Sequence, residues 1–228
     1  MCQPWKCRAS HVFLFITDTA VNVSPAVSDK RDIVQNAIDL AHALGLQEPK
    51  VAILSAQETL SPKLESSFDA AVLCKMADRG QITGGVLDGP LGYDVAVSAA
   101  AETKKIASPI AGKADILVVQ DLEAGTMLVK LLQYMSDAEV ADLVIGARVP
   151  VIVSSRTNTM LARLASCAWA LLSVRHWQVS PSSSRPAGSM NRCRNRGVRR
   201  PRRSRWRRVS LSHIKKTHPP HQYLGVRW

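Results

Sequence analysis

Residues 115–126 read Asp-Ile-Leu-Val-Val-Gln-Asp-Leu-Glu-Ala-Gly-Thr. The segment 115–119 is a short apolar run of β-forming residues, which is typical of a buried strand. A polar loop is expected at 120–126, and a helix is predicted from Gly125 to Met135. A buried strand that leads through a short polar loop into an amphipathic helix is the repeating unit of α/β proteins.

The same alternation extends in both directions from this unit. Further strands are predicted at Val12–Ile16, Val51–Leu54, Gly85–Asp88, Leu143–Gly146 and Val151–Ser154. Further helices are predicted from Ser28 to Gly45, Leu64 to Arg79, Val95 to Ile106, and from near Asn158. The pattern predicts an α/β fold with a largely parallel sheet and helices on both faces, a three-layer α/β/α arrangement. Since such sheets bind ligands at the carboxyl ends of their strands, the loops 88–94, 120–126 and 154–159 are the candidate site.

Charge divides the chain into two unlike parts. All 18 acidic residues and 15 of the 30 basic residues lie in residues 1–170, which gives that part a formal charge of −3. Residues 171–228 contain the other 15 basic residues and no acid, so the net charge of +12 comes from this segment. The basic pI of the whole chain therefore describes neither part.

The two parts are predicted to differ in order as well. Residues 1–170 are expected to form the α/β lobe, and residues 171–228 a basic disordered tail without apolar periodicity. One explanation of the tail is out-of-frame translation of a GC-rich gene, which would yield many Arg, Pro, Ser and Trp residues. The other is a genuine extension that binds nucleic acid non-specifically through the phosphate backbone.

Several classes of protein are disfavoured by the composition. The five cysteines are odd in number and lack paired spacing, so we expect neither a disulfide framework nor a metal site. The apolar runs fall short of the ~20 residues of a membrane helix. We therefore expect a cytoplasmic protein with no membrane partner.

Motifs for dinucleotide binding, for a P-loop and for a nucleophile elbow are absent from the sequence. Five other blocks occur in order: 77–82 (Ala-Asp-Arg-Gly-Gln-Ile), 88–91 (Asp-Gly-Pro-Leu) with Asp94, 114–119 (Ala-Asp-Ile-Leu-Val-Val), 121–125 (Asp-Leu-Glu-Ala-Gly) with Lys130, and 146–150 (Gly-Ala-Arg-Val-Pro) before Ser155-Arg156. In order and spacing these blocks resemble the phosphate acetyltransferase and phosphate butyryltransferase family. The resemblance covers Val12 to Ala170 and is closest to the two-domain hydratase/phosphate acetyltransferase branch.

The resemblance implies transfer of an acetyl or other short acyl group between coenzyme A and inorganic phosphate. Acyl-CoA and phosphate would be the partners, with the coenzyme A thioester as substrate and no bound cofactor. Ser155 and Arg156 match the catalytic pair of the family. A guanidinium can bind two phosphate oxygens at once, and a hydroxyl suits the oxyanion of the attacked thioester.

The resemblance also implies substrate-binding positions, namely Asp88, Asp94, Gly125, Thr126 and Lys130. Structural interpretations stay open beside these functional ones. An arginine after a strand often only faces solvent, and a serine there often caps a helix. An aspartate beside Gly89-Pro90 is a common turn former.

The chain also departs from the family pattern. Relatives commonly have Pro at Gln120, Asn at Thr126 and Asp at Asn158, and one branch has a carboxylate at Ala162. Family members begin well upstream of Val12 with a segment that supplies further arginines. We therefore expect a fold that is incomplete relative to the family, with impaired activity; the alternative is a non-catalytic remnant or binding domain. Apolar surface left open in this way would favour homo-oligomers or aggregation.

Overall fold

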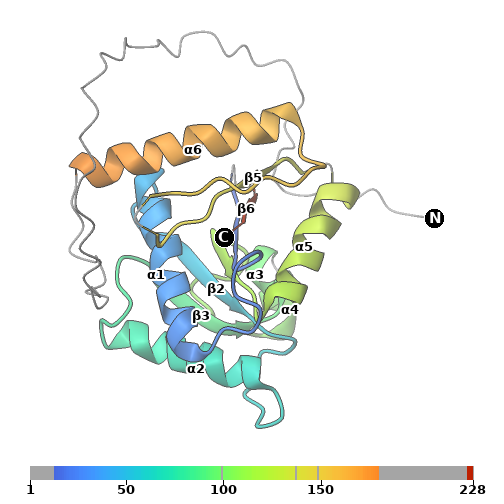
Figure 1. The fold of residues 1–228 in the computed structure, drawn as a ribbon. Coiled ribbons are helices and arrows are strands. Elements are labelled where there is room, and N and C mark those ends of the chain that lie inside the picture. Colours follow the sequence, from blue (N-terminus) through green and yellow to red (C-terminus); the bar gives the residue numbers. More distant parts are fainter. Residues whose placement is uncertain (1–12, 99, 137, 148, 180–224, 228) are drawn as a thin grey trace, which may run out of the picture.

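The centre of the molecule is a four-stranded parallel sheet with the strand order β1-β4-β2-β3 (Figure 1). The computed structural model describes residues 13–98, 100–136, 138–147, 149–179 and 225–227. The strands of the sheet are β1 (Phe15–Thr17), β2 (Lys50–Leu54), β3 (Val86–Leu91) and β4 (Ile116–Val118). Because β4 pairs with both β1 and β2, the segment 115–119 lies in the middle of the sheet, as a buried apolar run should.

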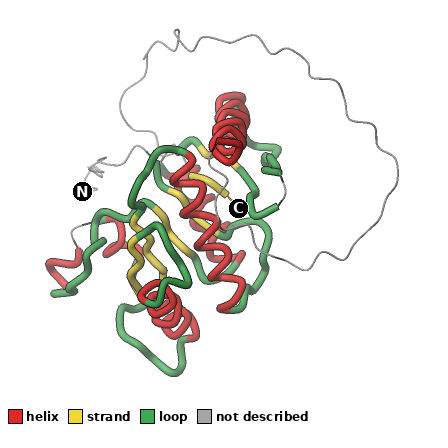
Figure 2. Tube along the Cα trace, turned by 90° about the vertical axis from the view of Figure 1, so that its left-hand side faces the viewer, coloured by secondary structure: helices red, strands yellow, loops and turns green. Residues whose placement is uncertain are grey.

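Helices cover both faces of this sheet (Figure 2). They are α1 (Val27–Ala43), α2 (Glu65–Asp78), α3 (Tyr93–Val97), α4 (Ala100–Lys104), α5 (Leu122–Met135) and α6 (Met160–Val179). Alternate strand residues face opposite sides. Ile116 and Val118 belong to the core cluster with α1, α2 and α6, whereas Leu117 and Val119 belong to the cluster with α3, α4 and α5. The predicted three-layer α/β/α fold is therefore confirmed.

The third strand is longer than predicted. We expected it to end at Asp88 in a Gly89-Pro90 loop, but β3 continues through both residues to Leu91. Pro90 is tolerated because β3 is an edge strand of the sheet. On its outer side there is no neighbouring strand whose carbonyl would need the N–H that proline lacks. The register between β2 and β3 shifts at this point, between Ala52 and Leu54.

The helix predicted for 95–106 is interrupted. Ser98 has an extended backbone, and its hydroxyl donates to the Asp94 carbonyl over 2.5 Å. A serine that bonds locally to the backbone competes with helix hydrogen bonds, so two short helices, α3 and α4, replace one.

The predicted strands at 143–146 and 151–154 are also wrong. Among the described residues there, Val144 and Val151 form an isolated antiparallel bridge. The loop that joins them contains a positive-φ turn at Gly146 and Pro150, which lacks a backbone N–H. The preceding residues form β5 (Val140–Asp142) instead, which pairs in parallel with β6 (Gly225–Arg227).

The last described helix runs past the predicted lobe boundary at Ala170 and ends at Val179. It lies across one end of the molecule (Figure 1). Trp169 on this helix lies against the rings of Phe13 and Phe15, at centroid distances of 5.5 and 5.8 Å. Its outer face is apolar and exposed, with side chains that include Met160, Leu161, Leu164, Leu171 and Leu172. Most of the predicted tail, residues 180–224 with their arginine-rich run, lies outside the described residues.

Within the described ranges, no helix combines the length and apolar character needed to cross a membrane.

Candidate active site

The first group of predicted site residues lies where α5 meets the strand ends. Asp121 caps α5 by accepting from the Ala124 amide over 2.8 Å, which starts the helix three residues earlier than predicted. Gly125 follows on the buried side. A Cβ there would lie 2.8 Å from methyl groups of Thr19 and Val119, so only glycine permits this close approach.

Thr126 fastens the same helix to the loop after β1. Its hydroxyl donates to the Thr19 carbonyl over 3.0 Å. The loop is itself ordered by Asp18, a buried carboxylate that accepts from the amides of Ala20, Val21 and Asn22. Gly125 and Thr126 thus join α5 to the carboxyl ends of β1 and β4, and both have packing roles in addition to the binding roles that the resemblance implies.

Lys130 lies further along α5, about 7.5 Å from Gly125 along the helix axis at 1.5 Å per residue. Its ammonium donates to the Gln133 side chain over 3.2 Å and lies 3.5 Å from Thr157 Oγ1. It also lies 5.8 Å from the centre of the Tyr134 ring, within range of a cation–π interaction. Lys130 is therefore a half-buried cation that faces the segment before α6.

Ser155 belongs to that segment. Its hydroxyl oxygen lies 3.0 Å from Thr157 Oγ1, so Thr157 connects Lys130 to Ser155. Ser155 is half-buried, whereas the neighbouring Arg156 is exposed. The structure therefore brings two predicted residues, Lys130 and Ser155, to one place and leaves the Arg156 guanidinium open to solvent beside them.

Two sets of contacts hold this segment, a buried one at Asn158 and an exposed one at Thr159. Asn158 donates its side-chain amide to Asp142 Oδ2 over 2.6 Å, and its backbone amide donates to the Ser155 carbonyl. Thr159 donates to Glu139 over 2.8 Å and accepts from the Ala162 amide at the start of α6. The Ser155 segment is thereby anchored to β5 and to α6.

Asp88 and Asp94 form a separate group near β3. Asp88 accepts from the adjacent Gly89 amide over 2.9 Å. It also lies near Cys74, whose pKa is raised to about 12, chiefly by burial of the thiol and secondarily by the negative charge of Asp88. Asp88 lies within β3 and not in a turn, so the turn-forming interpretation is wrong, and its binding role stays a prediction.

Asp94 is held in a surface ion pair. Its carboxylate lies 2.8 Å from Lys104 Nζ, which also donates to Glu58 over 2.7 Å. The hydrogen bond from Lys104 holds the pKa of Asp94 below its usual range, and the same bond raises the pKa of Lys104. Neither aspartate is placed with Ser155 by a contact that the structure shows.

Sequence reasoning missed three residues of this arrangement: Thr157, Asn158 as an anchor, and Lys104. Thr157 and Asn158 fall inside the loop 154–159 that was a candidate by topology, so their position was foreseeable. Their partners Lys130 and Asp142 lie 27 and 16 residues away, which no spacing rule reveals.

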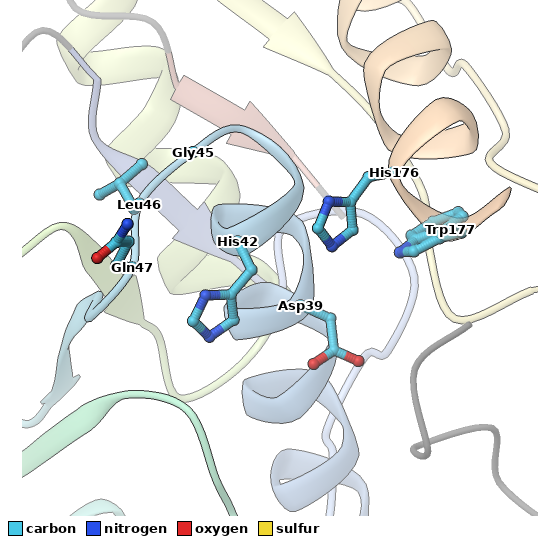
Figure 3. Close-up of a pocket in the computed structure, with 7 residues that line it drawn as sticks. All are labelled: Asp39, His42, Gly45, Leu46, Gln47, His176 and Trp177. Carbon is cyan, nitrogen blue, oxygen red and sulfur yellow. The ribbon is translucent and has the colours of Figure 1, made fainter. Parts of the chain in front are cut away.

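A pocket of about 460 Å³ lies elsewhere, between the ends of α1 and α6 (Figure 3). It is lined by Asp39, His42, Gly45, Leu46, Gln47, His176 and Trp177, none of which was a predicted site residue. The described residues contain no group of three or more His, Cys, Asp or Glu side chains placed to hold a metal ion.

The sequence was compared with known protein families. Residues 3–169 match the phosphate acetyl/butaryl transferase family. This match begins nine residues before the Val12 at which the resemblance was expected to start.

Among curated proteins, the chain is 57% identical over 176 residues to a phosphate acetyltransferase of Rhizobium meliloti, covering 72% of this chain and 56% of that protein. It is 46% identical over 159 residues to a probable phosphate butyryltransferase of Bacillus subtilis, covering 69% of this chain and 53% of that protein. The chain thus spans about half the length of the curated relatives it matches.

Among solved structures, the fold is similar to a branched-chain phosphotransacylase from Enterococcus faecalis, with a TM-score of 0.63 and 35% identity, covering 71% of this chain and 58% of that one. A phosphotransacetylase from Staphylococcus aureus has the same fold at 22% identity and a TM-score of 0.59, covering 70% of this chain and 49% of that one. Because residues 3–169 match the family and a member is 57% identical over 176 residues, the chain belongs to the phosphate acetyl/butaryl transferase family.

Proposed function

We propose that the protein transfers an acetyl or other short acyl group between coenzyme A and inorganic phosphate. A phosphate oxygen attacks the carbonyl carbon of the thioester, the C–S bond breaks, and coenzyme A leaves as the thiolate. The products are an acyl phosphate and coenzyme A. Coenzyme A enters as a substrate thioester, so the reaction needs no resident cofactor, and we expect it to take place in the cytoplasm.

The observation that carries the proposal is the placement of Ser155, Arg156 and Lys130 in one region of a chain that belongs to this family. Two cations and a hydroxyl are the groups that an anionic nucleophile and a developing oxyanion require. The exposed Arg156 guanidinium is free to bind two phosphate oxygens. The Ser155 hydroxyl would stabilise the oxyanion on the attacked carbonyl.

The chain's length relative to its relatives determines the level of activity that we expect. The chain matches about half of the relatives' length, and we propose that groups from their other half complete the cleft. Losses of several stabilising groups multiply, each typically worth about 10²–10³ in rate. We therefore expect the 228-residue chain to be far less active than a version extended by the upstream part of a relative.

The assay is phosphate-dependent release of thiol from acetyl-CoA, measured in both proteins. Arg156→Ala in the extended protein is expected to lower the rate by about 10² or more. Arg156→Lys should recover little, because a point charge cannot replace the bidentate fork. Arg163→Ala is the matched control, since this arginine is also exposed and lies on α6.

Two outcomes would count against the proposal. Thiol release that does not depend on phosphate would indicate a thioesterase rather than a transferase. Full activity of the Arg156→Ala protein would remove that residue from the site. Self-association and binding of nucleic acid through residues 171–228 stay predictions.

A further inference from the structure

Three polar groups, one on α5 and two in the loop before α6, form a row of successive contacts. Lys130 Nζ lies 3.5 Å from Thr157 Oγ1, and Thr157 Oγ1 lies 3.0 Å from Ser155 Oγ. The Thr157 backbone amide also donates to Ser155 Oγ, over 3.4 Å. Thr157 is thus the only link between the cation and the serine among the contacts that the described residues show.

The chemistry of these groups gives the row a direction. An ammonium has three donors and no acceptor, so Thr157 Oγ1 is the acceptor in its contact with Lys130. Either hydroxyl can be the donor in the contact between Thr157 Oγ1 and Ser155 Oγ, and repulsion of the Thr157 hydrogen by the positive charge of Lys130 favours donation from Thr157. With that donor, Ser155 Oγ would accept from both the hydroxyl and the amide of Thr157, which would occupy both of its acceptor positions.

We infer that Thr157, polarised by Lys130, is a positioning residue that turns the Ser155 O–H outward as a hydrogen-bond donor. The inference rests on the proposed function for its catalytic meaning, since a donor aimed away from Thr157 is what an oxyanion requires. No proton is transferred in this arrangement; Ser155 keeps its hydrogen and only orients it.

The backbone fixes this geometry independently of Lys130. Asn158 donates its amide to the Ser155 carbonyl over 3.1 Å and is anchored on buried Asp142. Ser155 and Thr157 therefore keep their mutual position when the lysine is altered. Replacing Lys130 should change the direction of the hydroxyl hydrogens but not the path of the chain.

The direct test is neutron diffraction from deuterium-exchanged crystals of the full chain. We expect the deuterium between the two hydroxyl oxygens to be bound to Thr157 Oγ1, with the Ser155 deuterium pointing away from Thr157. A deuterium on Ser155 Oγ that points at Thr157 overturns the inference, whether or not the chain is active. In Lys130→Met crystals we expect this preference to be lost.

The kinetic test uses acetyl-CoA and inorganic phosphate with Thr157→Val, which keeps the shape of the side chain and removes the hydroxyl. We expect kcat to fall about tenfold, less than the loss of an entire oxyanion donor, with KM for both substrates unchanged. Thr157→Ser should restore kcat. Because part of the effect of Lys130 passes through Thr157, Lys130→Met should lower kcat by a smaller factor in the Thr157→Val protein than in the parent.

Thr103→Val is the matched control, because Thr103 is an exposed threonine on α4 and makes no contact with the row. If Arg156→Ala abolishes turnover while Thr157→Val leaves kcat unchanged, the inference is wrong and the proposed function stands. If no phosphate-dependent thiol release occurs in the extended protein, the proposed function fails, and the neutron result still decides the orientation of Ser155.

Discussion

Asn158 donates its side-chain amide to Asp142 over 2.6 Å, and both residues are more than nine-tenths buried. The contact joins the Ser155 segment to β5, so it decides where that segment lies. Asn158→Ala removes a donor from a buried carboxylate and should cost about 1–3 kcal/mol in the free energy of unfolding. Urea denaturation followed by circular dichroism measures this loss.

Asn158→Asp offers a sharper version of the same experiment. It places two carboxyl groups in contact, which raises the pKa of at least one of them above its unfolded value. A raised folded pKa favours stability below the unfolded pKa, and that contribution is lost as the pH rises. The variant should therefore be closest to the parent in stability at acidic pH and weakest near neutrality. A constant difference across pH would show that the two side chains separate.

Gly125→Ala should destabilise the fold, although alanine is the better helix former by about 1 kcal/mol. The added methyl would lie 2.8–2.9 Å from Thr19, Val119 and the Asp18 carbonyl, so α5 must shift. Overpacking of this kind costs about 1–3 kcal/mol, measurable as a lower melting temperature. Glu123→Ala, an exposed change in the same turn, is the control and should be nearly neutral.

Lys30 and Asp69 form a buried ion pair between α1 and α2, with an N–O distance of 2.5 Å and side chains 2% and 8% exposed. Lys30→Met leaves the carboxylate buried without its cation, and we expect a loss of about 3–5 kcal/mol. Adding Asp69→Leu should recover much of this loss. The exposed pair Lys75–Asp78 is the control, because its side chains are 63% and 66% exposed and Lys75→Met should cost less than about 1 kcal/mol. Equal effects at both pairs would refute the argument from burial.

The Asp94 pKa can be read from an NMR titration of its carboxyl carbon, and we expect a value below the ordinary range. A lowered folded pKa means that the ion pair with Lys104 contributes stability above the unfolded pKa of aspartate. That contribution is lost as the pH falls through the folded pKa. Lys104→Met should return the pKa of Asp94 toward its ordinary value, whereas Lys113→Met should leave it unchanged.

The fold class was predictable because it depends on local patterns. The buried run 115–119 follows from β-propensity, and the ends of α1 and α2 follow from the positive-φ glycines Gly45 and Gly80. Errors arose where tertiary position decides. Pro90 continues a strand only because that strand is an edge, and edge position is a property of the whole sheet.

The candidate site was predictable only in part, for a similar reason. The blocks around Ser155 and Lys130 were identified by family resemblance, but their meeting depends on how α5 and the segment before α6 pack. Asp94 was identified in the same way, and its ion pair with Lys104 was not foreseen. A residue type and its place in a motif do not specify partners that are distant in sequence.

The close approach at Gly125 has a mechanical consequence. It fastens α5 to the ends of β1 and β4, so Lys130 moves with the sheet. Ser155 is fastened through Asn158 and Thr159 to β5 and α6, so it moves with those elements instead. The contact of Lys130 with Thr157 therefore joins two parts of the fold that are anchored separately, and a shift of α5 relative to the start of α6 would lengthen it.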